Sequence, residues 1–142
     1  MTYIAAELHR LVTSRADNCC EYCLLSQQDS SFTFHIEHVI AEKHGGETDE
    51  NNLCLSCPEC NIYKGSDIAS LDRVTGIPIL TLLFNPRRQR WDDHFRLNGA
   101  LIEPLTPEGR VTVNTLQMNR PEAIAEREIF LKLGTYPCRQ FH

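Results

Sequence analysis

Two short stretches, CEYC at residues 20–23 and CPECNIYKG at residues 57–65, place four cysteines in two Cys-x-x-Cys pairs. We call each pair with its turn a knuckle. Two knuckles can supply four thiolates to one zinc ion in a closed tetrahedral site with no open coordination position. The gap between them is longer than in a simple zinc ribbon, so it should contain further structure. The predicted structural zinc ligands are Cys20, Cys23, Cys57 and Cys60.

Bulk composition is typical of a globular protein. Hydrophobic residues make up 42% and charged residues 23% of the 142 residues. No apolar run approaches the roughly 20 residues of a membrane span, so no membrane partner is expected. A chain of this length favours one domain over residues 1–142.

The remaining cysteines are predicted to be free thiols. Residues 1–7, MTYIAAE, have neither a basic leader nor a long apolar run, so we expect a cytoplasmic protein in a reducing compartment, where disulfides are not expected. An odd total of seven cysteines also favours metal plus free thiols. The three thiols outside the knuckles are Cys19, Cys54 and Cys138, of which Cys54 should be buried because it lies in an apolar run.

Charge is distributed unevenly along the chain, whose formal net charge is −5. Residues 1–70 hold four Lys and Arg against eleven Asp and Glu, a balance of −7; residues 71–142 hold ten against eight, a balance of +2. Basic side chains normally supply affinity for nucleic acid. The best candidates for contact with a nucleic-acid backbone are Arg87, Arg88 and Arg90, although a solvated surface is the plainer interpretation of any single arginine.

The segment between and after the knuckles predicts two strands and a helix. Residues 32–40 are rich in β-branched and aromatic residues, a loop with two glycines follows at 43–47, and an apolar run at 53–55 forms a second strand. Pro58 suits the first turn of a helix that stops near Gly65.

Outside this segment the signals are more local. Apolar residues at helical spacing predict an amphipathic helix over the first ~15 residues, packed on the zinc-binding knuckles. Downstream, a turn at Thr75-Gly76 leads into a strand at 79–84, and Asn98-Gly99 indicates a two-residue β-hairpin. Two helices should finish the chain; their expected caps are Thr106 and Asn119, and the second should end at Gly134.

Several of these residues follow the order of a known family. The motif His35-x-Glu37-His38, a Gly-Gly loop, Asn52-Leu53 and then CPECNIYKG together resemble the HNH endonuclease family. The resemblance covers roughly Cys20 to Gly65. A weaker similarity, from Leu83 to Arg110, is to the tail of small stand-alone bacterial HNH proteins.

This resemblance implies an α+β fold. A zinc-stabilised, treble-clef-like ββα-metal core would cover about residues 18–66, after an N-terminal helix. A C-terminal extension at about 67–142 would hold the β-hairpin and the two final helices.

The resemblance also implies a role for each matched residue. His38 matches the general base that takes a proton from the attacking water, a task that histidine performs near neutral pH. Glu37 and Asn61 match the ligands of one divalent metal, and their hard oxygen atoms suit Mg²⁺ or Mn²⁺. Asn52 matches the residue that holds the loop and orients the base. Lys64, on the helical face of Asn61, would contact phosphate.

Strand geometry restricts how these residues can cooperate. Adjacent residues of a regular strand point to opposite faces, so the strand must end or twist at Glu37-His38 for both to address one phosphate. His35 shares the face of Glu37 and is either a further metal ligand or a structural histidine. Glu37 replaces the aspartate more usual in the family, and Asn61 stands where some members have histidine, which leaves the preferred metal open.

The favoured function is therefore a metal-dependent HNH endonuclease that hydrolyses DNA phosphodiester bonds and leaves 5′-phosphate and 3′-hydroxyl ends. The main alternative is a non-catalytic zinc module that binds nucleic acid or protein. A Cys-x-x-Cys thiol oxidoreductase is a third interpretation and would need exposed cysteines of low pKa. Because the chain is acidic, help from a homodimer or a partner subunit in binding DNA is also plausible.

Overall fold

The computed structural model describes residues 2–74 and 76–139, which form a mixed α/β fold. Its helices are α1 Ala6–Arg15, α2 Pro58–Lys64, α3 Trp91–His94, α4 Pro107–Thr115 and α5 Pro121–Leu133. Its strands are β1 His35–His38, β2 Leu53–Ser56, β3 Ala69–Asp72, β4 Ile79–Leu82, β5 Phe95–Asn98 and β6 Leu101–Pro104. Short 3-10 turns cover Gln27–Asp29 and Glu42–His44. No helix in the described part of the chain combines the length and the apolar character that crossing a bilayer requires.

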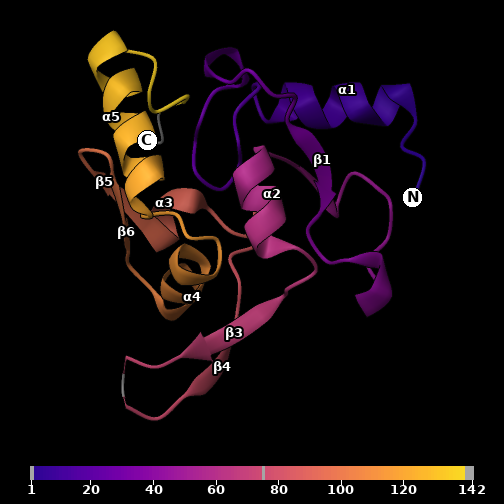
Figure 1. The fold of residues 1–142 in the computed structure, drawn as a ribbon. Helices are drawn as coiled ribbons and strands as arrows, with labels where there is room; N and C mark the ends of the chain where they lie inside the picture. The colour runs from indigo at the N-terminus through magenta and orange to yellow at the C-terminus, as the bar shows by residue number, and fades with distance from the viewer. Residues whose placement is uncertain (1, 75, 140–142) are drawn as a thin grey trace.

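The six strands pair consecutively into three antiparallel two-stranded sheets, β1-β2, β3-β4 and β5-β6. In the first sheet Glu37 faces Cys54 and His38 faces Leu53 across the ladder. Helix α1 packs on this sheet, and α2 leaves the end of β2 and contacts β1 (Figure 1). The chain therefore runs strand, strand, helix through the segment where the sequence predicted that order.

Strand β1 is shorter than the predicted 32–40. Before the strand, Gln27 Oε1 accepts from Phe34 N at 2.7 Å. After it, Val39 N still donates to Asn52 O, but Asn52 N donates to Asp49 O, so the reciprocal ladder bond to Val39 O is not formed and the ladder ends; Asn52 Oδ1 accepts from Ile40 N at 2.9 Å. The strand ends only after His38, so Glu37 and His38 keep consecutive ladder positions and face opposite sides, and the break expected between them is not present.

Helix α2 forms the second knuckle together with the end of β2. Cys57 is its N-cap, and the Cys57 sulfur accepts from Cys60 N. Pro58 occupies the first turn, where its missing N–H removes no helical hydrogen bond. Gly65 ends the helix with φ of 53°, a left-handed value that glycine adopts without strain. Both bounds coincide with the sequence prediction.

The C-terminal half differs from expectation at several points. Strand β3 and the one-turn helix α3 were not predicted, and β4 stops at Leu82 rather than at residue 84. Thr75 of the expected turn lies outside the described residues. The β5-β6 turn falls on Gly99 and Ala100, one residue later than predicted.

The two final helices also differ in their caps. Thr106 caps α4, as its hydroxyl accepts from Gly109 N at 3.0 Å. The predicted cap at Asn119 is wrong, because α5 has Arg120 as its N-cap. The Asn119 side chain instead bonds both backbone groups of Ile102 and so fastens β6 to the start of α5.

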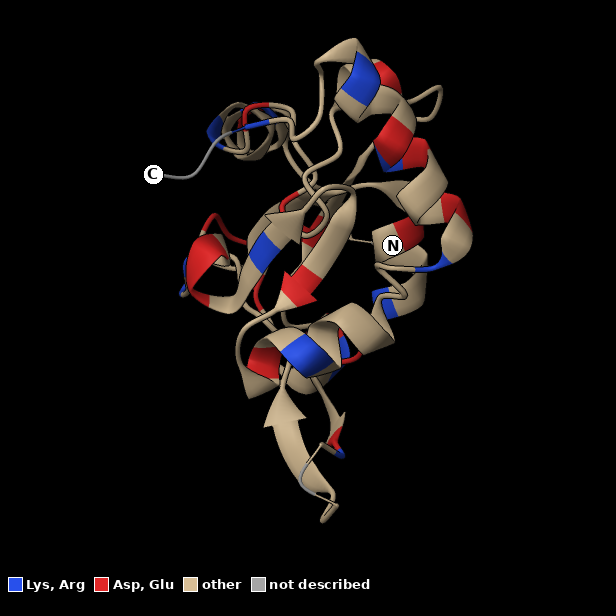
Figure 2. Cartoon of the chain, turned by 90° about the vertical axis from the view of Figure 1, so that its left-hand side faces the viewer, with Lys and Arg blue, Asp and Glu red and all other residues tan. Residues whose placement is uncertain are grey.

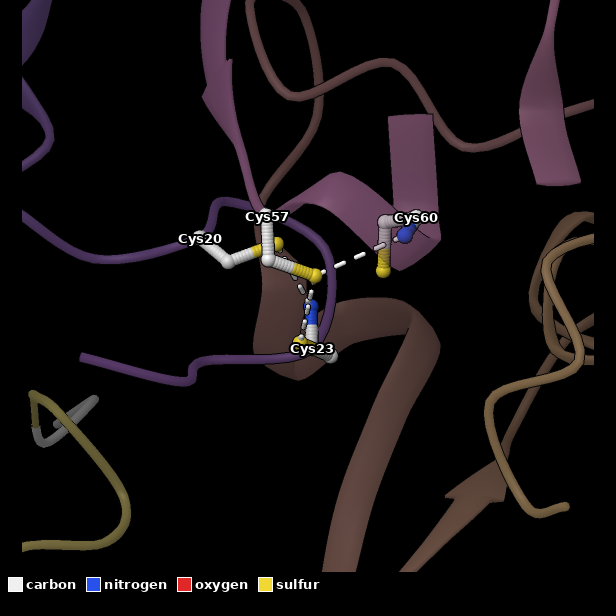
Figure 3. Close-up of side chains that lie close together, drawn as sticks. All are labelled: Cys20, Cys23, Cys57 and Cys60. Atoms are coloured by element: carbon white, nitrogen blue, oxygen red, sulfur yellow. Dashed lines mark hydrogen bonds between the residues drawn. The ribbon is translucent and has the colours of Figure 1, made fainter. Parts of the chain in front are cut away.

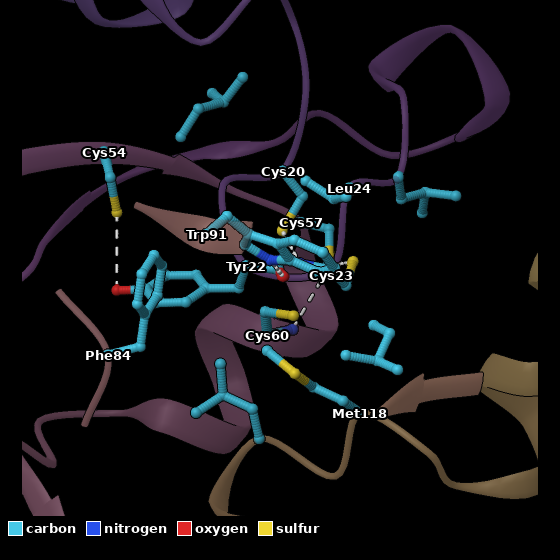
Figure 4. Close-up of a cluster of buried hydrophobic side chains, with 14 of the residues drawn as sticks. Cys20, Tyr22, Cys23, Leu24, Cys54, Cys57, Cys60, Phe84, Trp91 and Met118 are labelled. Atoms are coloured by element: carbon cyan, nitrogen blue, oxygen red, sulfur yellow. Dashed lines mark hydrogen bonds between the residues drawn. The ribbon is translucent and has the colours of Figure 1, made fainter. Parts of the chain in front are cut away.

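One apolar cluster joins the knuckles to the C-terminal half (Figure 4). The four knuckle cysteines pack with Tyr22, Phe84, Trp91 and Met118. Phe84 lies edge-on to both Tyr22 and Phe95, with ring centroids 6.4 and 5.2 Å apart. The C-terminal half therefore packs its own core residues against the two knuckles.

The expectation that disulfides are absent is wrong for two of the three additional cysteines. Cys19 and Cys138, separated by 119 residues, form a disulfide. Sequence spacing gives no signal for this pair because the contact depends on how the C-terminal segment returns to the first knuckle. Cys54 is a free, fully buried thiol, as predicted.

Candidate active site and metal centre

The knuckle cysteines converge at the centre of the fold (Figure 3). Their four sulfur atoms lie within 4.8 Å of one another, and Cys23 Sγ is 3.7 Å from Cys57 Sγ. A tetrahedral zinc ion with Zn–S bonds of about 2.3 Å places its sulfurs about 3.8 Å apart. All four residues are buried. The geometry and the donor atoms are therefore compatible with a closed structural zinc site.

The four thiols are strongly coupled: the pKa of Cys20 is lowered, whereas hydrogen bonds with the neighbouring thiols raise the pKa of Cys57 and Cys60. Burial opposes ionisation of Cys20, but hydrogen bonds from the neighbouring thiols outweigh it and hold the pKa of Cys20 well below its usual value. Cys23 N points at Cys20 Sγ at 3.5 Å, and Cys60 N points at Cys57 Sγ at 3.4 Å. Backbone N–H groups aimed at the sulfurs favour the thiolates that a zinc ion requires.

The C-terminal half fixes the first knuckle through its backbone. Trp91 Nε1 donates to Tyr22 O at 2.7 Å, between the two cysteines of that knuckle. Tyr136 Oη donates to Cys23 O at 2.7 Å. Neither contact was predicted, since each joins residues that are far apart in the sequence.

Glu37 and Lys64 form a buried ion pair between β1 and α2. Lys64 Nζ lies 3.2 Å from Glu37 Oε1, and the two side chains are 1% and 6% exposed. Neither carboxylate oxygen of Glu37 has a hydrogen-bond partner among the described residues. Burial raises the pKa of Glu37 to about 7, even though the ammonium of Lys64 lowers it. The expected phosphate contact of Lys64 is not formed by this buried position.

His38 points away from Glu37, toward the loop that follows β1. Its Nε2 lies 2.8 Å from Thr48 Oγ1 and 3.8 Å from Glu42 Oε1, and its side chain is 17% exposed. Within the described part of the chain Nδ1 forms no hydrogen bond. Thr48 was missed by the sequence analysis because a single threonine in a loop carries no recognisable pattern.

Asn52 closes the loop between β1 and β2. Its amide nitrogen donates to Ile40 O and Glu47 O, both at 2.9 Å, while its oxygen accepts from Ile40 N. Gly46 lies against the same backbone: a Cβ there would be 1.7 Å from Ile40 O. The expected loop-holding contacts of Asn52 are present, whereas no hydrogen bond joins it to the His38 ring in the described residues.

Replacing Asn52 with alanine should lower the free energy of unfolding by about 2 to 3 kcal/mol, since three hydrogen bonds of about 1 kcal/mol each are lost. Asn51→Ala is the matched control, because Asn51 is exposed and its amide side chain makes no comparable bonds; its effect should stay within about 0.5 kcal/mol. Urea unfolding of both variants measures the difference. Equal stabilities would show that Asn52 does not hold the loop.

The other candidate metal ligands are less constrained. Asn61 is half-buried on α2, one turn before Lys64, and its side chain forms no hydrogen bond among the described residues. His35 is exposed, and although strand alternation puts it on the face of Glu37, no group of three potential ligands forms around it in that part of the chain. Of the three candidate metal ligands, Glu37 is buried, Asn61 is half-buried and His35 is exposed.

Sequence comparison bears directly on this segment. Residues 20–67 match the family model of the HNH endonuclease. This segment is similar to HNH endonucleases. No curated protein and no solved structure matches the chain. The HNH match spans both knuckles, β1, β2 and α2, and it indicates a nuclease-type function with a nucleic-acid substrate.

Beyond the HNH segment, the three candidate arginines have different environments. Arg87 forms an ion pair with the buried carboxylate of Glu21, whose pKa burial raises although Arg87 lowers it. Arg90 pairs with Asp92 at 3.1 Å on the surface. Arg88 is exposed, and no ion pair to it is formed within the described residues. Arg87 is therefore structural, which a run of arginines cannot reveal.

Basic and acidic residues are interspersed along the helices in the view of Figure 2. The projecting β3-β4 hairpin carries almost no charge in the same view. The formal net charge of −5 also means that the chain lacks the excess of positive charge that usually supports nonspecific DNA binding.

Proposed function

We propose that the protein is a metal-dependent endonuclease that hydrolyses phosphodiester bonds in DNA. The observation that carries the proposal is the match of residues 20–67 to the HNH endonuclease family, a segment that holds Glu37 and His38 at the end of β1, Asn61 on α2 and the four-cysteine cluster. Helix α2 contacts β1, and Cys57 and Cys60 tie the start of α2 to the first knuckle.

His38 is assigned as the general base. A hydrogen bond in which Nε2 donates to Thr48 leaves the lone pair on Nδ1, and Glu42 near Nε2 favours the same tautomer. Nδ1 is then the atom that takes a proton from water as the water attacks phosphorus. Thr48 fixes the ring, so it acts by positioning rather than by contact with the substrate.

Glu37 and Asn61 are assigned as the ligands of one divalent cation. The fit rests on their chemistry: Glu37 offers two buried carboxylate oxygens that make no hydrogen bond among the described residues, and Asn61, on the helix that contacts β1, offers an amide oxygen, so both donors are hard oxygen atoms. Bound there, Mg²⁺ or Mn²⁺ would offset the negative charge that develops on the phosphate and on the leaving oxygen. The remaining coordination positions would be open to water and phosphate.

The domain organisation, the product ends and the contacts with DNA are also proposals. The whole chain would act as one domain, with an HNH core at about residues 18–66 of ββα-metal type, because one apolar cluster spans both halves. We propose that cleavage leaves 5′-phosphate and 3′-hydroxyl ends. Arg88 is the arginine best placed to contact the DNA backbone, and the weak basic surface favours a dimer or a partner subunit that adds affinity.

The test is cleavage by zinc-loaded protein of supercoiled plasmid and of end-labelled single-stranded, duplex and branched DNA. Cleavage is expected with Mg²⁺ or Mn²⁺ and not when these ions are withheld; withholding is preferable to chelation because it leaves the knuckles intact. Ligatable nicks would identify the predicted ends. A folded, zinc-loaded protein that cuts none of these substrates would refute the endonuclease.

A non-catalytic zinc module is the second candidate, and one observation favours it. Glu37 is 7% exposed and already neutralised by Lys64, an arrangement that a purely structural ion pair would also show. This candidate predicts one tightly held zinc per chain, binding of nucleic acid or protein, and no cleavage. The plasmid experiment separates the two.

A further inference from the structure

The contact between α2 and β1 is built around the amino group of Lys64. Its Nζ lies 3.2 Å from Glu37 Oε1 and donates to His38 O at 3.4 Å. Lys64 thus touches the side chain of one candidate catalytic residue and the backbone of the next. Helix α2, which presents it, also carries Asn61 one turn earlier.

This lysine is the cation that balances a buried carboxylate. Lys64 and Glu37 are both nearly inaccessible to solvent, and Glu37 has no hydrogen bond among the described residues. A buried carboxylate without a partner is strongly unfavourable, so a positive charge must lie close to it. Lys64 is the basic side chain that meets this need in the described part of the chain.

We propose that Lys64 is a resident counter-ion that holds the cation position beside Glu37 in the metal-free protein, and that its amino group must withdraw before a divalent metal binds there. The inference rests on the proposed function, because it assumes that Glu37 is a metal ligand. It makes Lys64 a regulator of metal affinity and not a phosphate contact.

Electrostatics requires the exchange. A divalent ion on Glu37 Oε1 would stand within a few ångströms of the ammonium, and like charges at that distance repel strongly in a buried environment. The carboxylate needs only one of the two cations. Withdrawal of Lys64 also breaks its bond to His38 O, so metal binding would release the backbone of the proposed base.

The first experiment uses the unaltered zinc-loaded protein. Lysine acetylation read by mass spectrometry reports which amino groups solvent can reach, and the chain has two further lysines, Lys43 and Lys132, both exposed, as internal standards. Without a divalent ion Lys64 should be protected. With Mn²⁺ its labelling should rise at least several-fold, while the labelling of the two standards stays constant.

The second experiment measures Mn²⁺ binding by the spin-resonance signal of the free ion. Lys64→Gln should bind Mn²⁺ at least about tenfold more tightly than the unaltered protein, because the competing charge is gone. Lys43→Gln is the matched control and should change nothing. Adding Glu37→Gln to Lys64→Gln should abolish the gain.

The outcomes separate this inference from the proposed function. Binding that depends on Glu37 while Lys64 stays protected, or affinity that is equal or weaker in Lys64→Gln, overturns the counter-ion alone and leaves a metal site in place. If neither protein binds Mn²⁺, both the counter-ion and the catalytic metal at Glu37 are refuted. Binding by Lys64→Gln but not by the unaltered protein would mean that the lysine blocks the site without withdrawing, and it would overturn the exchange.

Discussion

His38→Ala should reduce metal-dependent DNA cleavage by at least about a hundredfold, which is the lower end of what a general base contributes. Alanine cannot accept a proton from the attacking water. The fold should survive, because the ring is 17% exposed and its hydrogen bond is to a single loop threonine, Thr48. Initial rates of plasmid nicking at saturating Mg²⁺ measure the loss.

The matched control is His9→Ala. His9 is an exposed histidine on α1 and belongs to no part of the proposed site, so its removal should leave the rate unchanged. Circular dichroism and zinc content should be the same in both variants. A His38→Ala protein that cuts as fast as the His9→Ala protein would rule out His38 as the base.

Loss of zinc should unfold the core. Structural zinc in small domains contributes about 10 to 16 kcal/mol of apparent binding free energy, which is comparable to the entire stability of about 5 to 15 kcal/mol of a typical domain. The four sulfurs lie inside the apolar core cluster, so loss of zinc would remove the bonds that tie the two knuckles together at the centre of that cluster. Cys60→Ser should therefore prevent folding at ordinary temperatures.

The single tryptophan offers a direct readout of this prediction. Trp91 is 5% exposed and donates to Tyr22 O inside the first knuckle. Its emission should shift to the red in Cys60→Ser and after strong chelation. Cys54→Ala, which removes a buried thiol outside the zinc cluster, should cost only about 1 kcal/mol and keep the native emission. Unchanged emission after verified loss of zinc would contradict the role of the metal.

The elements around the metal frame were predictable because their signals are local. Pro58 and Gly65 set the start and the end of α2 through backbone preferences that act within one turn. The Cys-x-x-Cys spacing of the two knuckles identifies the zinc ligands. Strand β3 carried no such signal: its residues, Ala69–Asp72, become a strand by pairing with β4, and Asp72 pairs with Arg110 of α4. Tertiary contacts determine that element.

At the candidate site, too, local sequence signals were predictable and tertiary contacts were not. A family pattern could nominate Glu37, His38 and Asn61, but it could not say that Lys64 lies buried against Glu37. Side-chain direction at the end of β1 depends on where Asn52 interrupts the ladder, and the burial of Lys64 depends on how α2 packs on β1. Residues can be listed from a motif, whereas their partners require the packed structure.

The link between Cys19 and Cys138 turns most of the chain into a closed covalent ring. The HNH segment and the extension lie on the same ring. Two hydrogen bonds, from Tyr136 Oη to Cys23 O and from Cys138 N to Leu24 O, also join its two ends. A protease that cuts a surface loop between the two cysteines would open the ring without releasing a fragment. Both pieces would migrate together on a non-reducing gel and separate only after reduction.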